Sequence, residues 1–258
     1  MKKIFIVGCS YSHWYDGDCL NESYPALIAK HFPDCHVYDL SEPGGANDSA
    51  YLRLRQCEEN VGSPDKVIIQ WTHLGRANIV MDDSHTPRFP FSDFKTNAVG
   101  GRFTNYTYFD DSFKSNKSVC VTPSLLNNIV GTNKHRRLAM FAESTLLSVK
   151  TIKQFFSWYL NSHQQRWNLQ KEIDLVNAVY GKDNVLMFDW GNGYHHPGSD
   201  LEHSITVPSN WIGSVADALD NKFMALGVDD SPHYAAEGHL EVYKWLSPHI
   251  RKLLNANI

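Results

Sequence analysis

Residues 4–12 read Ile-Phe-Ile-Val-Gly-Cys-Ser-Tyr-Ser, an apolar run that ends at a glycine and continues into two serines. A short apolar run bounded by a turn residue is typical of a strand that is buried on both faces. We therefore predict a first strand at residues 4–8, with Ser10 directly beyond its carboxyl end.

Strand and helix patterns then alternate along the chain. Further apolar runs predict strands at residues 35–40, 67–71 and 184–190, and periodic apolar positions predict helices at 24–31 and 48–60. Such alternation implies parallel strands joined by right-handed crossovers, so that helices cover both faces of one sheet. We read the whole chain, residues 1–258, as a single α/β domain.

The carboxyl-terminal half is expected to be mainly helical. Apolar residues recur every three or four positions from Leu138 to Tyr159 and again from Leu169 to Tyr180, where Gly181 is a normal C-cap signal. A closing helix is predicted with Leu240, Tyr243, Leu246, Ile250 and Leu253 on its apolar stripe, and Pro248 is expected to bend it.

Residues 78–134 interrupt this alternation. They contain prolines, glycines and many aromatic residues without a sustained period. A loop of this length in a compact domain is uncommon unless it is functional or carries small elements of its own. Two interpretations stay open: an aromatic lid over the site, and an added hairpin with its own small core.

Composition narrows the class of protein. The chain has 258 residues, 42% of them hydrophobic and 20% charged, and a formal net charge of -4, which gives no basic footprint for nucleic acid. Its five cysteines form no Cys-x-x-Cys pair, which argues against a disulfide framework and against structural zinc. The apolar run after Met1 is too short for a signal peptide, and no run is long enough to span a membrane. We therefore expect a cytoplasmic protein with no membrane partner.

The candidate chemistry combines Ser10 with Asp230 and His233, which lie in the segment Asp-Ser-Pro-His near the end of the chain. A nucleophilic serine needs a base within hydrogen-bond reach and a third group that orients the base. Asp229 and His239 are the competing acid and base. We assign Ser10 as nucleophile, His233 as base and Asp230 as its orienting partner.

Other polar residues follow the predicted strands and are expected at the same edge, because the carboxyl ends of parallel strands meet there. Gly44 and Asn47 follow the second strand, and Thr72 and His73 follow the third. We assign four residues to substrate binding: His13, Asn47, His73 and Arg76.

These segments resemble the SGNH or GDSL hydrolases. The resemblance rests on Gly8-Cys9-Ser10-Tyr11-Ser12, on Gly44 within Glu-Pro-Gly-Gly-Ala-Asn-Asp, and on Asp230-Ser-Pro-His233 followed by Gly238-His239. It covers the two ends and the first third of the chain. It implies a flavodoxin-like three-layer α/β/α sandwich of about five parallel strands, and ester hydrolysis without a cofactor or metal.

The sequence departs from the family at two positions. Cys9 stands where the family has aspartate, and Gln70-Trp71-Thr72-His73 lacks the asparagine whose amide helps to bind the oxyanion. We expect the Thr72 hydroxyl to take that place beside the backbone N–H groups of Ser10 and Gly44. Losing one such donor costs about 2.7 to 4 kcal/mol of transition-state stabilisation.

We predict a serine esterase acting on a small acyl ester, such as an O-acetyl group on a carbohydrate. The alternatives are an acyltransferase of the same fold and a non-catalytic carbohydrate-binding or structural module. A metal cluster is a weaker interpretation, because the spacing of its candidate ligands fits no common zinc pattern. Those candidates are His195, His196, Asp200 and His203.

Overall fold

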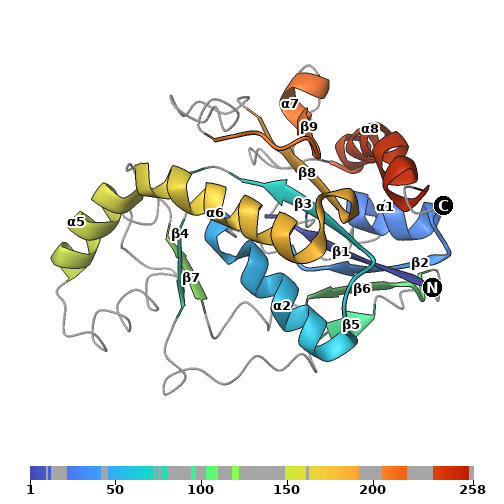
Figure 1. The fold of residues 1–258 in the computed structure, drawn as a ribbon, viewed down its shortest axis with the longest axis horizontal. Helices are drawn as coiled ribbons and strands as arrows, with labels where there is room; N and C mark the ends of the chain where they lie inside the picture. The colour runs from blue at the N-terminus through green and yellow to red at the C-terminus, as the bar shows by residue number, and fades with distance from the viewer. Residues whose placement is uncertain are drawn as a thin grey trace.

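A seven-stranded sheet lies at the centre of the fold, and helices cover both of its faces (Figure 1). This computed structural model describes residues 1–9, 11–12, 22–41, 46–72, 74, 77–80, 94–96, 103–109, 118–121, 149–160, 163–191, 205–219 and 235–255. The strands are β1 Lys2–Val7, β2 Cys35–Asp39, β3 Lys66–Trp71, β4 Ala77–Val80, β5 Phe94–Thr96, β6 Tyr106–Phe109, β7 Ser118–Val121, β8 Val185–Asp189 and β9 Trp211–Ser214. The helices are α1 Tyr24–His31, α2 Ala50–Val61, α5 Val149–Leu160, α6 His163–Tyr180, α7 Val215–Ala218 and α8 Ala236–Asn255, with 3-10 turns η2 Asn47–Ser49 and η6 Lys182–Asn184.

The strands of the main sheet lie in the order β5-β6-β2-β1-β3-β8-β9. All are parallel except β5, which pairs antiparallel with β6 at the edge. The order β2-β1-β3-β8-β9 is the flavodoxin-like order, with one strand order reversal beside β1. The predicted α/β sandwich is therefore confirmed, with six parallel strands where about five were expected.

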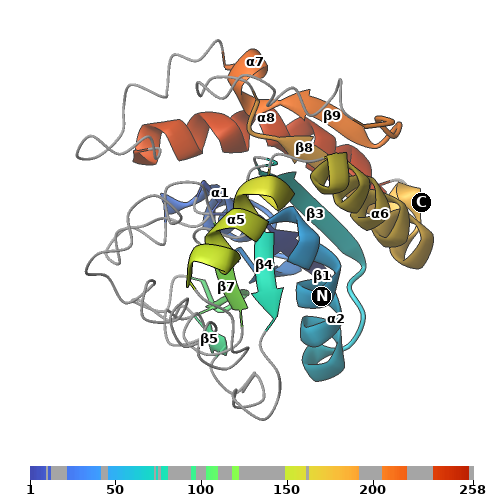
Figure 2. The same cartoon turned by 90° about the vertical axis from the view of Figure 1, so that its left-hand side faces the viewer.

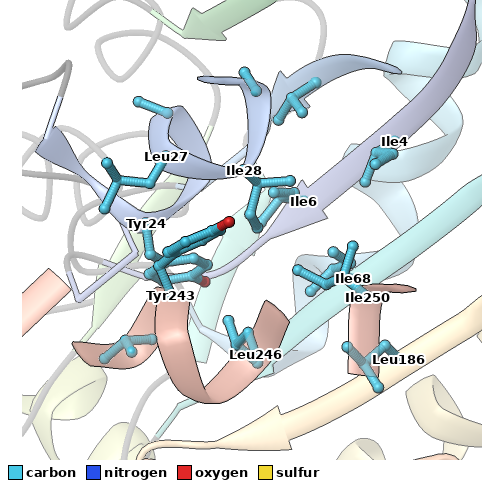
Figure 3. Packing of buried hydrophobic residues seen from close by; sticks show 14 of the residues in the cluster. Ile4, Ile6, Tyr24, Leu27, Ile28, Ile68, Leu186, Tyr243, Leu246 and Ile250 are labelled. Carbon is cyan, nitrogen blue, oxygen red and sulfur yellow. The ribbon is translucent and has the colours of Figure 1, made fainter. Parts of the chain in front are cut away.

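Alternation of side chains along β1 divides the core into two apolar clusters. Ile4 and Ile6 point to the face covered by α1 and α8, whereas Phe5 and Val7 point to the face covered by α2 and α6. Figure 3 shows the first cluster, in which side chains of α1 and α8 meet those of β1, β3 and β8. Because central strands are buried on both faces, their sequences are continuously apolar rather than alternating.

The aromatic-rich interval 78–134 contributes strands to two sheets. β6 extends the main sheet as a parallel neighbour of β2, and β4 pairs antiparallel with β7 in a separate two-stranded sheet. Asn105 fixes the start of β6, because its Nδ2 donates to the carbonyl oxygens of Ala29 (2.9 Å) and Cys35 (2.8 Å). Most of the interval 78–134 lies outside the described residues, and the choice between a lid and an added hairpin therefore stays open.

The helix predictions agree closely with the structure at α1 and at the end of α6, where Gly181 adopts a φ of 79°. α8 continues through Pro248. The assignment of Leu240 to the apolar stripe of α8 is wrong, because its side chain is exposed. His239 lies in the centre of the buried stripe instead, about 100° away around the helix axis from Leu240.

The predicted helix that starts near Leu138 lies only partly within the described residues, as α5. Phe156 is its buried anchor. Within the described ranges, no helix combines the length and apolar character needed to cross a membrane.

Candidate active site

The parallel strands bring the candidate site segments to one edge of the sheet. β3 points to the left in Figure 1, and Figure 2 views the molecule from that side. In register, Val7 of β1 lies beside Ile69 of β3, and Trp71 lies beside Asp189 of β8. The residues that follow β1, β2, β3 and β8 therefore share one end of the molecule, where open α/β sheets bind their ligands.

The chain reverses direction directly after β1. The N–H of Ser12 donates to the carbonyl oxygen of Cys9 at 2.9 Å. A Cβ atom on Gly8 would lie 1.9 Å from Ser12 Oγ, so the Ser12 side chain occupies space that only a glycine leaves free. In sequence, Ser10 stands between the two residues that this hydrogen bond joins.

Ser12 belongs to a buried polar network beneath the turn. Its hydroxyl donates to Gln70 Oε1 and lies 2.6 Å from the Tyr24 hydroxyl, which is then the donor to Ser12. Gln70 Nε2 in turn donates to the Cys9 sulfur at 3.6 Å. Burial raises the pKa of Tyr24 well above its usual value, and therefore its hydroxyl remains a proton donor.

A reciprocal pair of hydrogen bonds holds the end of β3. Asn47 Nδ2 donates to the carbonyl oxygen of Thr72, and the N–H of Thr72 donates to Asn47 Oδ1, both at 2.8 Å. Asn47 follows β2, so its amide acts as a clamp between two strand ends. This clamp fixes the backbone of Thr72 at the edge where the predicted nucleophile follows β1.

The Thr72 hydroxyl itself is buried without a hydrogen bond in the part of the chain that the structure describes. The residue is 3% exposed, and among the described residues no group accepts from or donates to its Oγ1. A buried hydroxyl without a hydrogen bond is costly, so natural proteins keep few of them. Its position after β3 is the one at which the sequence predicted an oxyanion donor.

Two buried groups at this edge were missed by the sequence reasoning. Arg53 of α2 donates from Nη1 to the carbonyl oxygens of Gly8 (3.0 Å) and Leu40 (2.8 Å), which ties the ends of β1 and β2 together. Ser41, directly after β2, is buried and its Oγ has no hydrogen-bond partner among the described residues. The available sequence signal for Arg53 was a charged residue between the apolar positions of the predicted helix. No sequence signal marked Ser41.

The residues that follow β8 lie at the same edge of the sheet, beside the end of β3. Tyr11 and Trp190 are both buried, and their rings stack with centroids 3.9 Å apart. Gly191 has a φ of 86°, and a Cβ atom there would lie 2.6 Å from Ser214 Oγ. Only glycine combines this left-handed conformation with such a close approach.

His239, the competing base, lies in α8 and is 1% exposed. Its Nδ1 accepts the N–H of Tyr24 at 3.3 Å. This bond joins the start of α1 to α8, so the described contacts of His239 are those of a packed helix residue.

The proposed triad and several binding residues fall outside the described residues. This holds for the catalytic and oxyanion candidates Ser10, Gly44, Asp229, Asp230 and His233, for the binding candidates His13, His73 and Arg76, and for the metal candidates His195, His196, Asp200 and His203. Their roles stay predictions. Thr72 and Asn47 are the predicted site residues that the structure describes, and it brings them into direct contact. In the described part of the chain, no cluster of three or more metal-ligating side chains occurs.

Comparison with known proteins finds a likeness in fold alone. No protein-family model and no curated protein matches the chain. Among solved structures, the chain is similar to the psychrotrophic esterase EstA from Pseudoalteromonas sp., in a structure inhibited by monoethylphosphonate. The TM-score is 0.51 and the sequence identity 14%, over 99% of this chain and 100% of that chain.

Proposed function

We propose that the protein is a serine esterase of the SGNH type that hydrolyses small acyl esters, with O-acetyl groups on a carbohydrate as the substrate class. Three observations support this proposal. The fold is similar to that of a known esterase along nearly the whole chain. The sequence places a serine after the first strand and Asp-x-x-His before the last helix. A buried hydroxyl for which the described ranges hold no hydrogen-bond partner lies at the end of the neighbouring strand β3.

The Thr72 hydroxyl is the observation that supports the proposal most strongly. Its Oγ1 is a hydrogen-bond donor that is already desolvated and finds no acceptor among the described residues. The clamp from Asn47 holds the peptide group of Thr72 from both sides. A fixed donor without an acceptor suits an oxyanion site, because the acceptor exists only while charge develops on the substrate oxygen.

In the proposed reaction, Ser10 Oγ attacks the carbonyl carbon of the ester and its proton passes to His233. The electron pair of the C=O bond moves to the oxygen, which is stabilised by Thr72 Oγ1 and by the N–H groups of Ser10 and Gly44. Collapse of this intermediate expels the alcohol, which takes the proton from His233. Water then hydrolyses the acyl-serine by the same steps, and Asp230 orients His233 throughout.

The network around Ser12 has a supporting role in this proposal. It anchors the chain on both sides of Ser10 through Cys9, Gln70 and Tyr24. Positioning of this kind keeps a nucleophile within reach of its base without any contact between the network and substrate. Asn47 uses both polar atoms of its side chain on Thr72, which leaves one N–H of its amide for the predicted substrate contact.

Covalent labelling tests the proposal. A fluorophosphonate probe reacts with an activated serine, and mass spectrometry of the digested protein locates the adduct. We expect a single adduct on Ser10 and a burst of product from p-nitrophenyl acetate. An adduct on another serine, or no adduct at all, would reject the mechanism. Product analysis with added sugars then separates a hydrolase from an acyltransferase.

A further inference from the structure

Helices α5 and α6 expose three large aromatic side chains, Phe155, Trp158 and Trp167, and the two on α5, Phe155 and Trp158, form what we call the aromatic patch. The exposed fractions of the three side chains are 52%, 64% and 62%. Large aromatic residues are usually buried at least in part, because each one buries a large apolar area in a core. Exposed apolar side chains that lie together mark interaction surfaces, whereas single scattered ones are normal.

The exposed side of α5 is ordered by contacts between rings. Phe155 lies 6.2 Å from the Trp158 ring and stacks on Tyr159 at 5.7 Å, while its edge-on neighbour Phe156 is buried. Positions 155 and 158 are one helical turn apart and therefore lie on the same face. Phe156 is buried, whereas Phe155 and Trp158 are exposed on the same helix.

The charge of this segment is opposite to that of the rest of the protein. Helices α5 and α6 together contain four basic and two acidic residues, which gives +2, whereas the whole chain has -4 and the remainder therefore -6. Lys150 and Lys171 are exposed, and neither they nor Arg166 forms an ion pair with another described residue. The aromatic patch thus stands within a cationic segment of an anionic protein.

The patch also lies near the predicted site. Figure 1 shows α5 at the end of the molecule toward which β3 points, and Figure 2, which faces that end, shows α5 in front. A partner bound to α5 would therefore be held at the same end of the molecule as Thr72 and the turn after β1.

We propose that the aromatic patch docks the protein on an anionic lipid surface. Helices with tryptophan and phenylalanine beside lysine and arginine bind in this way, because the rings enter the headgroup region and the cations attract anionic lipids. A second copy of the chain fits less well, since a symmetric contact would bring two net positive helix pairs together. Our expectation of no membrane partner rested on the lack of a spanning segment, which surface docking does not need.

Flotation of the full-length protein with lipid vesicles tests this inference. We expect binding to vesicles of phosphatidylcholine mixed with phosphatidylglycerol, weak binding to phosphatidylcholine alone, and loss of binding in high salt. Replacing both Phe155→Ser and Trp158→Ser should lower the partition coefficient by about tenfold or more. The matched control is Leu240→Ser, which removes an exposed apolar side chain from α8.

The outcomes separate docking from the proposed esterase function. Ser10→Ala should bind vesicles as the parent does, and the Phe155→Ser/Trp158→Ser variant should keep the parent's melting temperature. Lys150→Glu combined with Lys171→Glu should weaken binding to anionic vesicles only. Equal binding by the aromatic variant and the parent, or equal binding to both kinds of vesicle, would overturn the inference. A parent dimer in solution that the aromatic variant loses would assign the patch to a second copy instead.

Discussion

The strand ends after β1 and β3 each bury a hydroxyl group, and the two hydroxyls differ in one respect. Ser12 Oγ is fully used, since it bonds to Gln70 and Tyr24. Thr72 Oγ1 is equally removed from solvent and has no partner among the described residues. The first hydroxyl therefore stabilises the fold, whereas the second costs stability unless something else accepts its hydrogen bond.

This difference separates scaffold from chemistry at one edge of the sheet. Asn47 makes two hydrogen bonds to the backbone of Thr72, whereas the Thr72 side chain makes none with any described residue. Proteins tolerate such unsatisfied groups mainly at functional sites, where a ligand or a transition state supplies the missing partner. The comparison therefore predicts that variants at the two strand ends will affect different measurements.

The largest effect is expected from Ser10→Ala. If the turn after β1 carries the nucleophile, this variant should lose at least about 10³-fold in kcat, because only oxyanion stabilisation and binding remain. Its melting temperature should stay near that of the parent. Steady-state hydrolysis of p-nitrophenyl acetate checks the rate, and activity within about threefold of the parent would remove Ser10 from the mechanism.

A smaller effect is expected from pH. A neutral His233 must accept the Ser10 proton, so kcat/KM should fall about tenfold per pH unit below the ordinary histidine pKa of about 6.5 and level off above it. The Ser12 network should not contribute to this profile, because burial raises the pKa of Tyr24 and keeps its hydroxyl protonated. Chelators should leave the rate unchanged. A loss of activity in EDTA that zinc reverses would indicate a metal site at His195, His196 and His203.

The smallest of these effects concerns stability. Ser12→Ala leaves the Gln70 carbonyl oxygen and the Tyr24 hydroxyl without their buried partner, and we expect it to lower the free energy of unfolding by about 1 to 3 kcal/mol. Denaturant unfolding measures this change. Ser209→Ala, at an exposed serine, is the control and should have no measurable effect. An unchanged stability in Ser12→Ala would mean that its hydrogen bonds do not support the turn.

The central part of the fold could be predicted from sequence because its signals are local. β1, β3 and β8 are short apolar runs, α1 begins after the capping serine Ser23, and α6 ends at Gly181. In each case, residues close together in the sequence determine the local structure. The same reasoning placed Thr72 at the edge that the structure now shows.

The missed elements depend on distant contacts. β6 is a four-residue strand whose Tyr106 hydroxyl donates to Asp39, far away in sequence, at 2.9 Å. β9 contains Gly213 with a φ of 109°, which weakens any strand pattern. The clamp between Asn47 and Thr72 joins residues from two different strand ends, so no spacing in the sequence could reveal it.

Thr72→Val tests the central claim most directly, with kcat and melting temperature measured on the same preparation. Valine keeps the shape of threonine and removes only the hydroxyl. Ser41→Ala is the control, because it removes another buried hydroxyl that has no hydrogen-bond partner within the described ranges. The account predicts that kcat of Thr72→Val falls by about 10²-fold with little change in KM, while its melting temperature stays equal or rises. A melting temperature that falls while kcat is unchanged would contradict it, because the hydroxyl would then serve the fold and not the reaction.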